Sequence, residues 1–244
     1  MDHNRKTLLQ VPVDGYQIAD FMSKIEESFS NPHVATIFAI NPEKIMRALR
    51  DPELLSALKE ADFLIPDGIG TTIGIWLIHG ERIARTTGVD LMGRLLDLAE
   101  KKEYNVFLFG SAPEVIDRAS TKIVRAHPAL HLVGIQHGYL QKNKYEALIK
   151  KINELNTDLL FVGLGSPKQE KWIQRYKKIL QVKMCMAIGG SLDVLAGRNP
   201  RAPISYQYLG LEWLYRLISQ PQRFKRQLVL PKFIFEILRE KLLS

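Results

Sequence analysis

Residues 61–70 read Ala-Asp-Phe-Leu-Ile-Pro-Asp-Gly-Ile-Gly, and this stretch decides the fold prediction. Residues 63–65 form an apolar run typical of parallel strands that are covered on both faces. Pro66 ends the strand, and Asp67 and Gly68 turn the chain toward a following helix. Because ligands of open α/β sheets bind at the carboxyl ends of strands, Asp67 is a candidate for chemistry. The alternative is that Asp67 caps the helix or only forms the turn.

The same strand–turn–helix pattern recurs along the chain. Further apolar strands are expected over residues 34–40, 105–109, 131–135, 158–162 and 182–188. Helices are expected near 52–60, 70–79 and 90–102, from the turn at 110–114 to about 126, and near 143–155. Since right-handed crossovers join such units, the pattern predicts an α/β fold with a Rossmann-like parallel sheet flanked by helices. Asn41 followed by Pro42 indicates a helix start, and Ser111 with Glu114 has the spacing of a capping box.

Composition limits the class of protein. The chain has 244 residues, of which 46% are hydrophobic, so it can build a sizeable core. The one cysteine, Cys185, lies in an apolar run, which excludes an intramolecular disulfide and predicts a buried, inert thiol. The amino terminus shows no signal-peptide pattern, and no run of eighteen apolar residues is present.

The positive charge is concentrated at the carboxyl end. Residues 198–244 hold nine arginines and lysines against three glutamates, a net +6 of the chain's +8. We therefore expect an α/β body over residues 1–197 and a basic, amphipathic helical appendage over 198–244, with helices near 206–220 and 231–243 flanking a bend at 220–221. The apolar faces with interspersed basic residues indicate interfacial helices, and the alternative is ordinary packing on the body. Three arginines are candidates to clasp a diphosphate, or else form a solvated basic face: Arg216, Arg223 and Arg226.

Other motifs are weaker. Gly163-Leu164-Gly165 before a helix can hold phosphate on backbone amides, but Lys168 stands where a dinucleotide-binding motif has its third glycine. The histidines lack metal-ligand spacing and no Asp-x-Asp triplet occurs, so no metal site is expected. Reciprocal capping remains an alternative for Gln169, as N-capping does for Asn41.

Seven stretches together resemble the WecG/TagA/CpsF glycosyltransferase family across residues 10–227. In order, they are Asn41-Pro42-Glu43, Ile65–Gly70, Gly88–Leu91, Gly163–Glu170, Gly189–Asp193, Arg201–Pro203 and Leu211–Arg216. The resemblance implies an inverting, metal-independent enzyme that moves ManNAc from UDP-ManNAc to undecaprenyl-diphosphate-GlcNAc. The product would be a β1,4-linked disaccharide lipid of wall teichoic acid linkage-unit synthesis.

The resemblance also assigns roles to residues. Asp67 would be the base, and Arg85 the active-site arginine. Asn41 and Gln169 would contact the nucleotide sugar, and the arginines of the appendage would hold the lipid diphosphate. The turns at Gly163, Gly165 and Gly189 are expected to line the UDP-sugar site. Ala39 departs from the family, which usually has Thr there, and a lost hydroxyl hydrogen bond typically costs about 0.5–1.5 kcal/mol.

These assignments imply no cofactor and a cytoplasmic protein that is peripheral at the inner face of the cell membrane. Self-association in solution is expected from apolar helices exposed to water. Two alternatives stay open at this point. One is a relative that uses UDP-ManNAcA or UDP-glucose, and the other is a nucleotide-binding α/β module with a basic, nucleic-acid-binding tail.

Overall fold

The structure is a computed structural model, and it describes residues 4–208, 210–219 and 228–243. The chain divides into two compact units that each combine distant parts of the sequence. The first unit comprises residues 1–18, 39–87 and 201–244, and the second comprises residues 19–38 and 88–200. The division of the chain into a body over 1–197 and an appendage over 198–244 stays a prediction.

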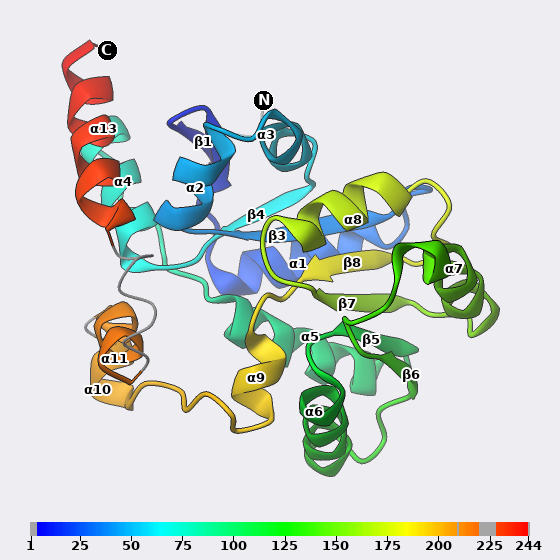
Figure 1. The fold of residues 1–244 in the computed structure, drawn as a ribbon. Coiled ribbons are helices and arrows are strands. Elements are labelled where there is room, and N and C mark those ends of the chain that lie inside the picture. The colour runs from blue at the N-terminus through cyan, green and yellow to red at the C-terminus, as the bar shows by residue number, and fades with distance from the viewer. Residues whose placement is uncertain (1–3, 209, 220–227, 244) are drawn as a thin grey trace. The chain divides into compact units, whose positions relative to one another are not determined.

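The predicted parallel sheet is present. Six strands lie in the order β4-β3-β8-β7-β5-β6 (Figure 1). Their bounds are β3 Ala35–Ile40, β4 Phe63–Pro66, β5 Val106–Gly110, β6 Leu132–Gln136, β7 Leu159–Gly163 and β8 Met184–Ala187. The pairs β3–β8, β7–β8, β5–β7 and β5–β6 are parallel, with Val106 opposite Leu159 and Gly110 opposite Gly163. This confirms the α/β, Rossmann-like fold.

In the second unit, the central strands β5, β7 and β8 are buried along their whole length, as their apolar sequences require. The unit's helices are α1 Ile18–Ser28, α5 Gly88–Lys101, α6 Pro113–Ala126, α7 Tyr145–Glu154 after a short 3₁₀ turn, α8 Lys168–Tyr176 and α9 Ser191–Leu195. Cys185 is buried in β8, and burial raises the pKa of its thiol.

One predicted helix cap in this unit is wrong, although the helix itself is present. The N-cap of α6 is Ala112, whose side chain forms no capping hydrogen bond. Ser111 adopts φ +57°, which is outside the extended conformation of an N-cap residue, and its hydroxyl lies 3.3 Å from Asp193. The strand-to-helix turn, rather than a capping box, therefore sets the conformation of Ser111.

The first unit contains a β-hairpin that the sequence patterns did not reveal. Strands β1 Arg5–Leu8 and β2 Val11–Asp14 pair antiparallel through a turn at Leu9 and Gln10, both with positive φ. The unit's helices are α2 Pro42–Ala48, α3 Pro52–Lys59, α4 Ile69–His79, α10 Ile204–Tyr208, α11 Glu212–Ser219 and α13 Val229–Leu243. The helix expected over residues 206–220 is therefore two helices, because Gly210 between them adopts φ +69°.

An ion pair fastens the hairpin to strand β4. The carboxylate of Asp14 accepts hydrogen bonds from Arg5 Nε (2.6 Å) and Nη2 (2.9 Å), and from the backbone amide of Leu64 (2.7 Å). Arg5 also donates to the carbonyls of Ala61 and Asp62. Asp14 is 2% exposed, so these contacts satisfy a charge that would otherwise be costly to bury.

Helix α13 packs by one face against the rest of the first unit. Phe233 and Ile237 are buried, and Phe233 lies against Gly74 of α4. Figure 1 shows helices α13 and α4 next to each other. Glu240 accepts a hydrogen bond from the amide of Leu9 in the hairpin turn. The opposite face is exposed and apolar, with Ile234, Phe235, Leu238, Leu242 and Leu243. Among the helices described, none combines the length and the apolar character needed to cross a bilayer.

Candidate active site

Asp67 follows the last residue of β4, at the carboxyl end of the strand. Its backbone amide donates to the carbonyl of Ile40 at the end of β3 (2.8 Å), and it is partly exposed. The N-cap of α4 is Gly68, whose φ of +103° favours glycine, so Asp67 does not occupy the capping position. The structure thus places this carboxylate at the edge where ligands of α/β sheets bind.

Asn41 lies beside Asp67 because it follows the carboxyl end of the neighbouring strand β3. Its Oδ1 accepts a hydrogen bond from the amide of Lys44 (2.9 Å), and Pro42 occupies the first turn of α2. The N-cap interpretation of Asn41 is therefore confirmed. The cap occupies the carbonyl oxygen, while the Nδ2 group on the other branch can donate to a ligand. Ala39, two residues earlier, is half-buried in β3.

Arg85 belongs to the loop that precedes α5, and a strand-end contact brings this loop to the site. The amide of Thr86 donates to the carbonyl of Pro66 (3.0 Å), the residue before Asp67. The guanidinium of Arg85 donates from Nη1 to Glu212 Oε2 and from Nη2 to the carbonyl of Gln207, both at 3.1 Å. The first unit therefore brings together an amide, a carboxylate and a guanidinium on three segments.

Gln169 lies on α8 in the second unit. It is 2% exposed, and its Oε1 accepts a hydrogen bond from the amide of Gly189 while its Nε2 donates to Glu170 (both 3.0 Å). The N-cap of α8 is Pro167, without a side-chain cap, so reciprocal capping does not occur at Gln169. The side chain instead ties the turn after β8 to α8.

The glycines predicted to line the nucleotide site follow the strands of this unit. Gly163 ends β7, and Gly165 and Gly189 lie in the turns after β7 and β8, with φ of +76° and +53°. Near these turns the sequence reasoning missed Asp193 on α9, which contacts the Ser111 hydroxyl and lies 3.7 Å from Arg198. The only hint was that the Gly-Gly-Ser-Leu-Asp stretch ends on a carboxylate.

The predicted residues thus fall into two groups that belong to different units. Asn41, Asp67 and Arg85 lie in the first unit, and Gln169 with the three glycines lies in the second. Of the arginines predicted to hold a lipid diphosphate, Arg216 is a residue of α11. Arg223 and Arg226 lie outside the described residues. Within the described parts of the chain, no three His, Cys, Asp or Glu side chains gather as metal ligands do. Metal independence stays a prediction.

Comparison with known proteins places these residues in a family context. The profile of the "Glycosyl transferase WecG/TagA/CpsF family" matches residues 6–244. A protein of Bacillus subtilis (strain 168) is 34% identical over 237 residues, which cover 97% of this chain and 92% of the relative. A protein of Bacillus spizizenii is 33% identical over 237 residues, with 97% and 91% covered.

Both relatives bear the name N-acetylglucosaminyldiphosphoundecaprenol N-acetyl-beta-D-mannosaminyltransferase. The family match extends over nearly the whole chain and includes every residue that the resemblance had singled out. This confirms the family expected from the order of the seven sequence stretches. The protein is therefore an enzyme that belongs to the WecG/TagA/CpsF family of glycosyltransferases.

Proposed function

We propose that this enzyme transfers N-acetylmannosamine from UDP-ManNAc to GlcNAc-diphosphoundecaprenol, with inversion and without a metal ion, in wall teichoic acid synthesis. The names of the two relatives support the acceptor and the transferred sugar. The observation that carries the chemistry is the position of Asp67. Its amide is bonded to the end of the neighbouring strand, and the adjacent Pro66 carbonyl anchors the loop that carries Arg85.

The proposed reaction is a single displacement. The 4-hydroxyl oxygen of GlcNAc attacks the anomeric carbon of ManNAc, the bond from that carbon to the UDP oxygen breaks, and UDP leaves from the opposite face. Asp67 accepts the hydroxyl proton as the general base. Negative charge grows on the leaving diphosphate, and Arg85 stabilises it together with backbone amides at helix N-termini. Asn41 contributes its Nδ2 group to the donor.

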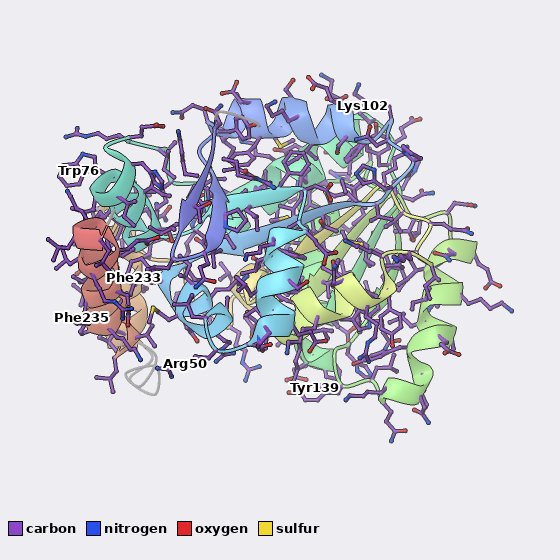
Figure 2. All side chains as sticks on the ribbon, turned by 90° about the horizontal axis from the view of Figure 1, so that it is seen from above. Arg50, Trp76, Lys102, Tyr139, Phe233 and Phe235 are labelled. Atoms are coloured by element: carbon purple, nitrogen blue, oxygen red, sulfur yellow. The ribbon has the colours of Figure 1, made fainter. Side chains whose placement is uncertain are left out.

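We further propose that the first unit contacts the membrane that holds the acceptor. The exposed face of α13 supports this, as does Trp76 on α4, which is 46% exposed and has the Arg82 guanidinium 6.0 Å from its ring centroid. In Figure 2, Trp76 and Phe235 lie along the same outer edge of this unit. Aromatic and basic side chains side by side suit the headgroup region of a bilayer better than a nucleic acid.

The test is direct. The purified enzyme is incubated with UDP-ManNAc and a lipid-diphosphate-GlcNAc acceptor, and UDP and the disaccharide lipid are measured, with and without a chelator. Asp67→Asn should lose roughly 10²- to 10⁴-fold in turnover and keep its affinity for UDP. Asp62→Asn, at the other end of β4, is the matched control and should retain activity.

Three results would contradict the proposal. They are equal turnover by Asp67→Asn, loss of activity with the chelator, and preferential use of UDP-glucose or UDP-ManNAcA. The first result would exclude Asp67 as the general base. The second would exclude the metal-free mechanism, and the third would exclude UDP-ManNAc as the preferred donor.

A further inference from the structure

Arg85 is held by the C-terminal part of the chain. The side chain of Arg85 is 19% exposed and that of Glu212 is 12% exposed, so the pair lies largely out of water, where ionic hydrogen bonds are strong. A guanidinium has five N–H groups in a rigid plane. Among the described residues, one is directed at Glu212 and one at the Gln207 carbonyl. Both contacts use the terminal nitrogens, so they fix the plane of the group.

The backbone around Glu212 is fixed independently of this ion pair. Glu212 begins α11, and the preceding Leu211 donates its amide to the carbonyl of Tyr206 (2.8 Å). Gly210 lies against Ile69, two residues beyond Asp67, so closely that a Cβ atom there would come within 3.0 Å of the Ile69 Cβ. These contacts hold the backbone that carries the Glu212 carboxylate in place beside the β4–α4 turn.

Glu212 also lies near a second cation, the guanidinium of Arg201. Arg201 Nε lies 3.9 Å from the other carboxylate oxygen of Glu212. One carboxylate thus faces two guanidinium groups and offsets the repulsion between their positive charges. Without it, this repulsion would be uncompensated, and among the described residues Arg85 would retain only its contact with the Gln207 carbonyl.

We propose that Glu212 is a positioning residue for the transfer reaction: its carboxylate holds the Arg85 guanidinium so that the remaining N–H groups face the leaving diphosphate. This inference rests on the proposed function, because that function gives Arg85 its task. A donor group held in place before the reaction stabilises a developing charge without first reorganising. Glu212 does this through Arg85 and touches no reacting atom.

The experiment is a double-mutant cycle in the full-length enzyme. Glu212→Ala should lower kcat roughly 10- to 100-fold, with a smaller change in the KM for the donor, since a small misplacement of a catalytic group is costly. In an Arg85→Ala background, the same substitution should have no further effect, because the group that it positions is gone. Glu212→Gln retains a hydrogen-bond acceptor of the same shape and should recover part of the loss.

A matched control separates this role from general stability. Glu81 lies close to Arg85 in the sequence and forms an exposed ion pair with Lys6 at 2.6 Å. Glu81→Ala should therefore leave kcat unchanged. Equal losses for Glu212→Ala in both backgrounds would show a structural role only and overturn the proposal. If Glu212→Ala does not fold, the isosteric Glu212→Gln carries the cycle.

The affinity for UDP, measured by calorimetry on the same four proteins, gives a readout that does not require transfer. We expect Glu212→Ala to weaken UDP binding when Arg85 is present and to leave it unchanged when Arg85 is absent. Wild-type enzyme that binds UDP but transfers no ManNAc would contradict the proposed function alone. Additive effects on UDP affinity would contradict the role of Glu212 alone.

Discussion

Asn41 has two roles in the proposed site, and substitutions at this position can separate them. Its Oδ1 caps helix α2 through the amide of Lys44, and its Nδ2 group is assigned to the UDP-sugar. Asn41→Ala removes both groups. Asn41→Ser keeps an oxygen that caps helices well and removes only the amide donor.

The expected magnitudes follow from these two contacts. Loss of the cap in Asn41→Ala should cost about 1 kcal/mol of the free energy of unfolding, which lowers Tm by roughly 2–4 °C in a chain of this size. Asn41→Ser should cost less than about 0.5 kcal/mol. Loss of one hydrogen bond to the donor, worth about 1.5 kcal/mol where the acceptor is charged, should lower kcat/KM roughly tenfold in both variants.

The chain provides a matched control for the cap. Asp51 caps α3 with the same arrangement, because its side chain accepts from the amide of Leu54 (3.1 Å) and Pro52 follows it. Asp51→Ala should destabilise the protein as much as Asn41→Ala and leave kcat/KM at the wild-type level. Urea unfolding and the UDP-release assay measure both quantities. Full activity in Asn41→Ser would refute the binding role, and a loss of activity in Asp51→Ala would show that capping alone explains the effect.

Three further predictions concern stability, reactivity and membrane contact. Asp14→Ala should cost about 3 kcal/mol in urea unfolding, because it leaves the Leu64 amide and the Arg5 guanidinium without their buried acceptor; a cost below about 1 kcal/mol would contradict this. Because burial raises the pKa of Cys185 from its ordinary 9.0, the thiol should react with an aromatic disulfide reagent only after unfolding. The unfolded chain loses this proton above pH 9 and the folded chain keeps it, so wild type should lose about 1.4 kcal/mol more than Cys185→Ala between pH 8 and pH 10, and equal losses would refute the assignment. Phe235→Ser should reduce co-sedimentation with anionic vesicles, whereas Tyr139→Ser, which removes an even more exposed aromatic ring of the second unit, should not; equal binding by the wild type and both variants would exclude α13 as the contact.

The sheet was predictable because all of its strands except the half-buried β6 are largely covered on both faces. Burial on both faces produces continuous apolar runs, and every run except the one over residues 131–135 is followed directly by a glycine, proline or asparagine that marks its end. The hairpin at residues 5–14 gives no such signal. Its turn residues, Leu9 and Gln10, adopt positive φ without glycine or asparagine, and β2 contains Pro12, which argues against a strand.

The candidate site was predictable where position along a strand decides it. Asp67 and Asn41 directly follow strands, so the parallel topology alone places them at one edge. Glu212 was not predictable, because its partner Arg85 is 127 residues away and only the tertiary structure brings them together. Ser111 and Gln169 were misleading, since each has the spacing of a capping box, but the tight turns after β5 and β7 direct their side chains elsewhere.

The first unit combines segments from distant parts of the sequence, and this affects the order in which the two units can fold. The amide of Leu9 is bonded to Glu240, and Arg85 is bonded to Glu212, so residues that are 231 and 127 positions apart in the chain complete the same structure. Domains generally fold as units while the chain is still emerging. The second unit ends at residue 200 and can complete its strands first, whereas the unit that carries Asp67 must wait until the segment from residue 201 onward has emerged. The ion pair between Arg85 and Glu212 therefore forms only after residue 212 has left the ribosome.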